Sequence, residues 1–326
     1  MLTKKILISS FLLLFILFPA HSQVNHAGER EMKAPRGFRS ERMLKFAYAF
    51  GSLKLIDTEP TVPANIDVTK DISYKLIDSI ELQLDIYKPK DLKENAPLLI
   101  FIHGGSWTKG KRADYLPYLI DYAKKGYITA TVSYRLSQVA PFPAAVEDVK
   151  CAVRWLRAHA EEYSINPDKI AVIGGSAGAH LAMMLAYSNE NEFSKDCTET
   201  ISSKVQAVVN LYGPVDLTTE YSRNAKSVEF FLGNTYQENP QIFTYASPKA
   251  HISPEDPPTL TFQGTLDSLV PVSQSDSLDV WLNKAGVISE YHRLKGWPHT
   301  MDISKKVNKY CQFYMDAFFK KYLGTN

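Results

Sequence analysis

The 326-residue sequence lacks a hydrophobic run that is long enough to cross a membrane as a helix. Its most apolar stretch, Ile6–Phe18, covers about 13 residues, whereas a spanning helix needs ~20. Lys4 and Lys5 precede this stretch, and the small-residue trio Ala20–Ser22 follows it. This order predicts a secretory signal peptide over residues 1–22 and no stable membrane anchor once it is cleaved. The expected location is secreted or periplasmic.

An excess of one charge is also missing. The chain holds 37 Lys+Arg and 35 Asp+Glu residues. Residues 1–22 contain two lysines and no acid, so cleavage leaves 35 basic residues against 35 acidic ones. A formally neutral chain without a dense basic run is a poor binder of nucleic acid, and no such partner is expected.

Cysteine is scarce as well. Cys151, Cys197 and Cys311 allow at most one intramolecular disulfide, and their spacing leaves open whether any pair forms. Cys151 lies in a helical pattern and is predicted to be a small core residue. No C-x-x-C or Cys/His spacing suggests zinc, so neither a metal nor a cofactor is expected.

From Asp71 onward, strand and helix patterns alternate, which predicts an α/β fold with a mostly parallel sheet and helices on both faces. One catalytic-size domain is predicted over residues 71–324. Residues 23–70 are predicted to be an N-terminal arm or linker, in which Ser40 caps a short helix. The sequence leaves open whether this segment folds over the active site. The expected strands cover 72–78, 81–87, 96–105, 127–134, 169–175, 205–213, 258–264 and 289–296, and the expected helices cover 115–125, 144–160, 179–187, 273–286 and 304–322.

A glycine-rich turn joins the expected strand at 169–175 to the helix after it, with the sequence Gly174-Gly175-Ser176-Ala177-Gly178. The spacing fits neither the G-x-G-x-x-G turn of dinucleotide sites nor a phosphate loop, which would need a lysine. It matches G-x-S-x-G, in which a strained turn lifts a nucleophilic serine above the sheet. Ser176 is therefore the candidate nucleophile, and the N–H of Ala177 is a candidate oxyanion donor.

A nucleophilic serine needs a base and an acid that orients the base. Asp267 follows the expected strand at 258–264, and His299 follows the next strand, so both lie at the edge of the sheet where ligands bind. The chain order serine, aspartate, histidine is the one that accompanies this type of turn. Asp216 also ends a strand, but it is predicted to cap the segment after it.

The strand at 96–105 ends in the sequence FIHGGSW. Backbone N–H groups of Gly104, Gly105 or Ser106 can turn toward the oxyanion there. His103 is predicted to hold this loop by hydrogen bonds rather than to exchange protons. Trp107 is predicted to line the substrate site, with a packing role as the equal alternative.

With these motifs, the chain resembles the α/β-hydrolase superfamily in its HGG/G-x-S-x-G esterase branch. The segments HGGSW, SYRL, FPAAVEDV and GGSAGAH look closest to acetylxylan- and feruloyl-esterase-like proteins, which are related to hormone-sensitive-lipase-like esterases. Ser106 and the pair Gly178-Ala179 depart from the usual pattern of the hormone-sensitive-lipase group, so that group's substrate range is not carried over.

The resemblance implies a secreted serine carboxylesterase that hydrolyses short acyl esters of the acetyl or feruloyl type, on a small-molecule or polysaccharide substrate. The alternatives are a general short-chain esterase or lipase, a serine peptidase, and an arylformamidase-like amide hydrolase. A binding module without activity is disfavoured, because such proteins commonly lose a triad residue and this sequence keeps all three. Oligomeric state stays open.

Overall fold

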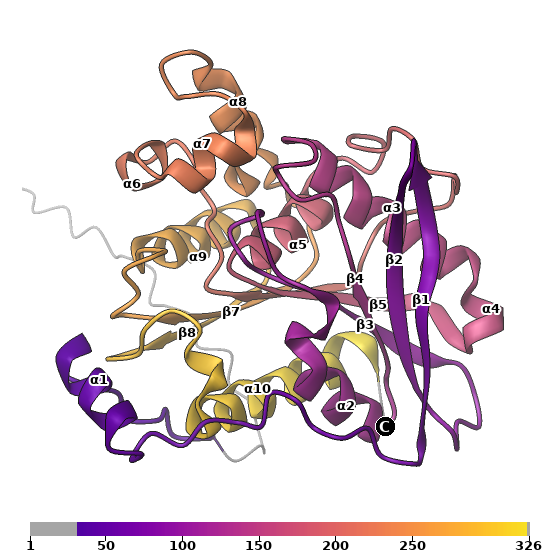
Figure 1. Cartoon of the computed structure of the whole chain (residues 1–326), viewed down its shortest axis with the longest axis horizontal. Coiled ribbons are helices and arrows are strands. Elements are labelled where there is room, and N and C mark those ends of the chain that lie inside the picture. Colours follow the sequence, from indigo (N-terminus) through magenta and orange to yellow (C-terminus); the bar gives the residue numbers. More distant parts are fainter. Residues whose placement is uncertain (1–30, 325–326) are drawn as a thin grey trace, which may run out of the picture. The chain divides into compact units, whose positions relative to one another are not determined.

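The computed structural model describes residues 31–324. Its centre is one sheet of eight strands (Figure 1). The strand order is β1-β2-β4-β3-β5-β6-β7-β8. Only the pairs β1–β2 and β2–β4 are antiparallel, and every other pair of neighbours is parallel. The bounds are β1 Ile66–Ile77, β2 Ile80–Pro89, β3 Ala96–Ile102, β4 Ile128–Val132, β5 Ile165–Gly175, β6 Ala207–Leu211, β7 Thr259–Gly264 and β8 Ser289–Leu294.

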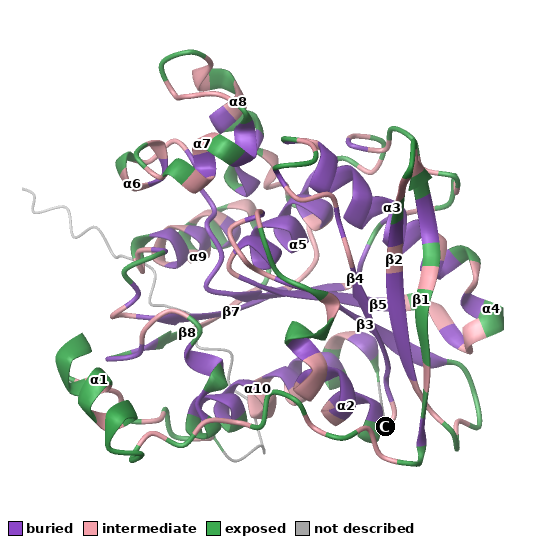
Figure 2. Cartoon of the chain, in the orientation of Figure 1, coloured by how far each residue is buried: buried purple, intermediate pink, exposed green. Residues whose placement is uncertain are grey.

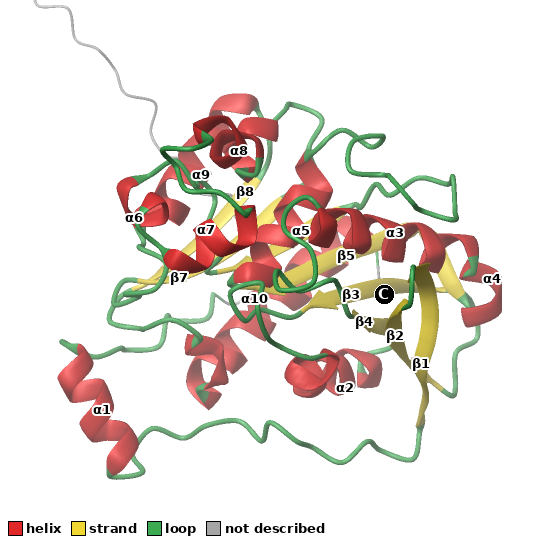
Figure 3. Ribbon diagram, turned by 45° about the horizontal axis from the view of Figure 1, so that its top comes forward, coloured by secondary structure: helices red, strands yellow, loops and turns green. Residues whose placement is uncertain are grey.

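Helices cover both faces of this sheet. Figures 1 and 3 show α2 and α10 on one face and α3, α5 and α9 on the other. The predicted α/β architecture, a mostly parallel sheet between two layers of helices, is confirmed. Within residues 31–324, no helix is both long and apolar enough to span a bilayer. The bounds are α1 Glu41–Ala49, α2 Leu116–Lys124, α3 Ala144–Ala158, α4 Ala160–Tyr163, α5 Ala177–Tyr187, α6 Glu220–Arg223, α7 Lys226–Leu232, α8 Pro240–Tyr245, α9 Ser273–Ala285 and α10 Lys305–Leu323.

The central strands are buried on both faces. Every residue of β3, β6 and β7 is buried, and Figure 2 colours this part of the sheet accordingly. A strand between two helical layers has no solvated face, so its sequence is a continuous apolar run such as APLLIFI in β3. Helix α5 is apolar around most of its circumference and also lies in the core.

The first strand begins earlier than predicted. β1 starts at Ile66, inside the segment that was predicted to be an arm up to residue 70. A register shift between Thr69 and Ile72, with Asp71 at φ 56°, interrupts the alternation of buried and exposed residues. Because a bulge moves side chains to the opposite face, the alternating pattern becomes visible in the sequence only after it.

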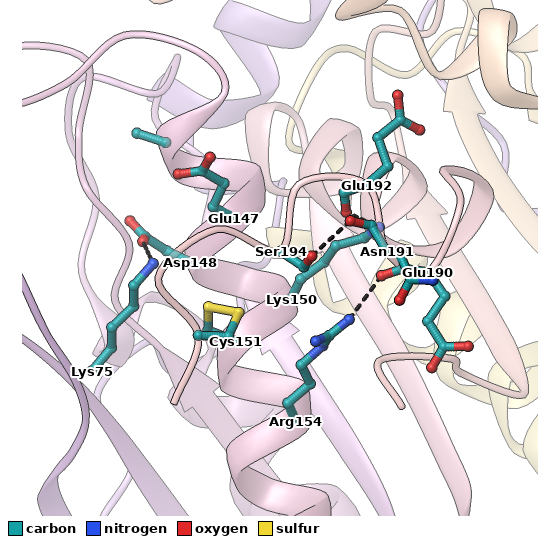
Figure 4. Close-up of a disulfide and its surroundings, with 12 residues drawn as sticks. Lys75, Glu147, Asp148, Lys150, Cys151, Arg154, Glu190, Asn191, Glu192 and Ser194 are labelled. Carbon is teal, nitrogen blue, oxygen red and sulfur yellow. Dashed lines mark hydrogen bonds and ion pairs between the residues drawn. A yellow bond between two sulfur atoms is a disulfide. The ribbon is translucent and has the colours of Figure 1, made fainter. Parts of the chain in front are cut away.

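A disulfide joins Cys151 of α3 to Cys197 in the loop after α5. Their Cα atoms are 5.1 Å apart and 46 positions separate them in the chain. Cys151 was predicted to be a small core residue, and it is buried, but its sulfur is bonded. Figure 4 shows Lys150 and Arg154 reaching from the same helix to the loop, where Lys150 Nζ donates to the carbonyl of Glu192 at 2.8 Å. The disulfide and these bonds fix the loop to α3.

Removing the disulfide is expected to destabilise the fold. In the double variant Cys151→Ser/Cys197→Ser, the unfolded chain regains the entropy of a closed loop of this length, which corresponds to roughly 4 kcal/mol in the free energy of unfolding. Guanidinium unfolding curves of the variant and of the wild type measure the difference. Wild-type protein unfolded with dithiothreitol is the matched control and should show the same loss. An unchanged midpoint in both samples would contradict the expectation.

Candidate active site

Ser176 occupies the turn between β5 and α5 with φ 55° and ψ −122°. This backbone conformation is strained for a residue with a side chain and is typical of a nucleophile turn. The two flanking glycines are required by close packing. A Cβ on Gly174 would lie 2.2 Å from the carbonyl oxygen of Gly178, and a Cβ on Gly178 would lie 2.1 Å from that of Ile102. The turn thus holds Ser176 at the carboxyl end of the central strand.

Asp267 and His299 lie side by side, with 2.6 Å between Asp267 Oδ2 and His299 Nδ1. The Asp267 carboxylate is buried and accepts further hydrogen bonds from the N–H groups of Leu269 and Val270 at 2.9 and 2.8 Å and from Gln263 Nε2 at 2.9 Å. An ionised carboxylate accepts only, so His299 Nδ1 must donate to it. The lone pair of the neutral ring is then on Nε2.

Tyr212 links the serine turn to the histidine. The Ser176 N–H donates to the carbonyl of Leu211 at 2.9 Å. The next residue, Tyr212, packs its ring edge-on against His299, with 4.6 Å between the ring centroids. Within the described residues, no hydrogen bond joins Ser176 Oγ to His299. Such contacts are often long without substrate and shorten in the reacting complex. The structure therefore brings Asp267 and His299 into direct contact, and it connects Ser176 to this pair through Leu211 and Tyr212.

A buried carboxylate that is connected to His299 through Tyr212 was not predicted from the sequence. Asp302 accepts hydrogen bonds from the hydroxyls of Tyr212 and Tyr118 at 2.5 and 3.2 Å. Burial raises the pKa of Asp302, and it raises the pKa values of both tyrosines well above the usual value. Tyr212 has φ 49°, which a bulky residue rarely adopts. The only sequence signal was an acid three residues after His299, and it does not identify the tyrosines.

The loop after β3 lies directly against the serine turn. A Cβ on Gly104 would lie 2.7 Å from the carbonyl oxygen of Gly175, which is too close for a side chain, so only glycine allows this approach. Among the described residues, the N–H groups of Gly104, Gly105 and Ser106 donate no hydrogen bond. Ala177 is the first residue of α5, where N–H groups have no partner within the helix. Of the predicted oxyanion donors, Gly104 thus lies against the serine turn and Ala177 directly follows Ser176.

Two other histidines near the site have structural contacts. His103 stacks on Tyr134, with 4.4 Å between centroids, and burial lowers the pKa of its ring. His180 Nε2 contacts the carbonyl of Ala246 at 2.7 Å, and burial lowers its pKa to about 4. Both rings are therefore neutral at pH 7, and neither contacts a carboxylate as His299 does.

Trp107 is buried rather than exposed to the site. Its ring stacks on Phe231 at 4.4 Å between centroids, and its Nε1 donates to His180 Nδ1 at 3.3 Å. Only 3% of the residue is exposed. Of the two roles left open by the sequence, this arrangement is the packing one, because the ring fixes the loop after β3 to α5 and α7.

Asp216 lies apart from the histidine. Its Oδ1 accepts hydrogen bonds from the N–H and hydroxyl of Thr218, and its Oδ2 forms an ion pair with Lys249 at 2.8 Å. These contacts stabilise the start of the segment after β6, as the sequence suggested for this residue. Among residues 31–324, no cluster of histidine, cysteine or acidic side chains has the arrangement of a metal site.

Residues 34–56, which belong to the predicted N-terminal arm, bond to the loop that carries His299. These bonds lie both before and after the histidine in the chain. On one side, Trp297 Nε1 donates to the carbonyl of Pro35 at 2.9 Å, and the Phe38 N–H donates to Gly296 at 2.8 Å. On the other side, the Ile56 N–H donates to the carbonyl of Ile303 at 2.9 Å. The sequence motifs gave no indication of these contacts, because most of them use backbone atoms.

Comparison with known proteins gives one matching family. The BD-FAE family model matches residues 84–282. Esterase LipQ of Mycobacterium tuberculosis is 34% identical over 69% of this chain and 55% of its own length. Its relative LipM, a probable carboxylic ester hydrolase of the same organism, is 36% identical over 59% of this chain and 46% of its own length. The chain thus spans about half the length of these curated relatives.

Solved structures give a similar result over more of the chain. The propionate-bound structure of the esterase Est2 from Thermogutta terrifontis is 28% identical, covers 81% of this chain and 98% of its own, and has a TM-score of 0.66. A bifunctional GH43-CE protein from Bacteroides eggerthii is 26% identical, covers 78% of this chain and 38% of its own, and has a TM-score of 0.68. The expected α/β-hydrolase fold and esterase resemblance are confirmed by these comparisons.

Proposed function

The chain belongs to the BD-FAE family, and from this premise and the geometry above we propose that it hydrolyses carboxylic esters by a Ser-His-Asp mechanism. The observation that carries the proposal is the hydrogen bond from His299 Nδ1 to the buried Asp267 carboxylate, in a fold that also holds Ser176 in a strained turn. This bond leaves the lone pair of Nε2 free to accept a proton, which is what a general base requires.

In the first step, Ser176 Oγ attacks the ester carbonyl carbon while His299 Nε2 takes the hydroxyl proton. The carbonyl oxygen becomes negatively charged and is stabilised by N–H groups of Ala177 and of Gly104, Gly105 or Ser106. His299 then gives the proton to the alcohol oxygen, the C–O bond breaks, and an acyl-serine remains. Asp267 stabilises the imidazolium that forms between these two events.

In the second step, water attacks the acyl-serine and loses its proton to His299 Nε2. The tetrahedral intermediate collapses, Ser176 Oγ regains the proton, and the carboxylic acid leaves. Every proton transfer in this scheme passes through His299 Nε2, and the backbone N–H groups only stabilise the oxyanion. Asp302 has no role in these steps, because its carboxyl group accepts hydrogen bonds from the hydroxyls of Tyr118 and Tyr212.

We propose short acyl groups, acetyl or feruloyl, as the acid part of the substrate and carbohydrate as the first candidate for the alcohol part. The propionate bound in the Thermogutta esterase supports a small acyl group, and the carbohydrate-esterase part named for the Bacteroides eggerthii protein supports the carbohydrate. A secreted or periplasmic location is part of the proposal. The Cys151–Cys197 disulfide supports it, because disulfides persist mainly in oxidising compartments. The predicted signal peptide lies outside the described residues.

Esters of apolar alcohols are a second candidate, favoured by one observation. A mostly apolar cavity of about 270 Å³ borders His299. A bare sugar would bring hydroxyl groups into this space, where the mostly apolar lining gives them few hydrogen-bond partners.

The test measures acid release from acetylated xylan, methyl ferulate and p-nitrophenyl esters of increasing acyl length, with Ser176→Ala protein as the blank. Release of acetate or ferulate, with rates falling steeply beyond butyrate, is the expected result. Undiminished rates on long acyl chains would contradict the short-acyl proposal. Equal release by wild type and Ser176→Ala would contradict the mechanism.

A further inference from the structure

The cavity beside His299 is formed jointly by the N-terminal arm and the histidine loop. Leu44 and Tyr48 of α1, together with Leu53 and Leu55 after it, form one wall. Pro298, His299, Met301 and Ile303 are among the residues of the opposite wall. Lys45, Thr300 and Ser304 also line the cavity, but most of its surface is apolar, so it favours a hydrocarbon group over a polar ligand.

The walls are held in position by the backbone. Residues 35–38 bond to Gly296 and Trp297 before His299, and an isolated bridge pairs Leu55 with Ser304 after it. In addition, the Lys305 N–H donates to the carbonyl of Lys54 at 2.9 Å. The cavity is therefore part of the folded arm and not a gap next to a loose tail.

Its position relative to His299 indicates which part of an ester it takes. In the proposed reaction, His299 Nε2 donates a proton to the alcohol oxygen, so the group bonded to that oxygen lies next to the histidine. The acyl part lies instead at Ser176 and the oxyanion donors, none of which lines the cavity. A dry cavity of ~150 Å³ already accommodates benzene, so about 270 Å³ is sufficient for a substituted ring.

We propose that this cavity is the subsite for the alcohol part of the substrate and that it selects an aryl or bulky alkyl group. The proposal rests on the proposed ester hydrolysis and develops its second candidate. It assigns the N-terminal arm the role of a specificity element, since the arm supplies one complete wall.

The test keeps the acyl group constant and varies the alcohol. Benzyl acetate and ethyl acetate have leaving alcohols of similar acidity and differ mainly in the ring. We expect wild-type protein to prefer benzyl acetate in kcat/KM. Leu44→Trp, which fills the cavity, should lower the benzyl-to-ethyl ratio at least about 10-fold. Leu53→Trp fills the same space from another part of the arm and should act in the same way.

Met43→Trp is the matched control, because it adds the same side chain to α1 at a position that is 49% exposed and does not line the cavity. Its benzyl-to-ethyl ratio should equal that of the wild type. A ratio near one in the wild type, or one that both fillers leave unchanged, would overturn the subsite while leaving ester hydrolysis intact.

Binding separates this proposal from the proposed function. Benzyl alcohol titrated into Ser176→Ala protein and followed by NMR does not require turnover. Weaker binding after Leu44→Trp supports the subsite even if no ester is hydrolysed. Equal binding with and without the filler would overturn it, whatever the enzyme assays show.

Discussion

Replacing Ser176 by alanine is expected to lower kcat for p-nitrophenyl acetate by a factor on the order of 10⁶. The reason is that the substitution removes the only atom able to form the acyl-serine, and His299 and Asp267 then have no nucleophile to activate. A residual rate above the water reaction should remain, because the oxyanion donors and the binding site are still present. Steady-state kinetics on both proteins measure the loss.

The fold should tolerate this substitution. Ser176 already has φ 55°, and alanine carries the same Cβ, so the backbone strain is unchanged. The unfolding midpoint of Ser176→Ala should therefore match that of the wild type. An organophosphate that phosphorylates active serines should add mass to the wild-type peptide containing Ser176 and leave the alanine variant unlabelled. Activity within about tenfold of the wild type would remove Ser176 from the mechanism, since loss of a triad nucleophile costs far more.

The strands, the helices and the serine turn could be predicted from the sequence, because each follows from a pattern of residues that are near one another in the chain. The continuous apolar run of β3 and the glycine spacing around Ser176 both follow from close packing between a strand and its neighbours. Asp267 and His299 could be paired in advance, because residues that follow parallel strands reach the same edge of the sheet.

What the sequence could not provide are contacts between distant segments that have no motif. The partners of Asp302, the hydroxyls of Tyr118 and Tyr212, come from α2 and from the end of β6, and no spacing rule connects them. The disulfide of Cys151 joins residues whose proximity depends on the path of the loop after α5. The position of the N-terminal arm could not be predicted for a similar reason. Its backbone hydrogen bonds to residues 296–305 do not depend on side-chain identity.

Asp267→Asn is expected to lower kcat by about 10⁴ with little change in KM, because the lost interaction acts in the transition state. The hydrogen bonds around the carboxylate determine how the amide would sit. The N–H groups of Leu269 and Val270 both point at Oδ1, so the carbonyl oxygen of the new amide would take that position. The NH₂ group would then replace Oδ2, facing His299 Nδ1.

In this orientation, the introduced amide donates to Nδ1, and the neutral His299 ring must carry its proton on Nε2. That tautomer has no lone pair directed at Ser176 and is unable to accept the hydroxyl proton. Gln263 Nε2 would also face a donor instead of an acceptor, which is expected to lower the free energy of unfolding by about 1–3 kcal/mol. The kinetic loss should exceed anything that this destabilisation explains, and the circular dichroism spectrum should be unchanged.

Asp216→Asn is the matched control. It makes the same chemical change at another largely buried carboxylate after a neighbouring strand, but Asp216 bonds to Thr218 and Lys249 and has no contact with His299. Its kcat should stay within a few-fold of the wild type, although loss of the ion pair lowers stability. If Asp216→Asn abolished turnover and Asp267→Asn did not, the orienting acid would be Asp216. The 2.6 Å bond between Asp267 and His299 would then be a structural contact and not part of the mechanism.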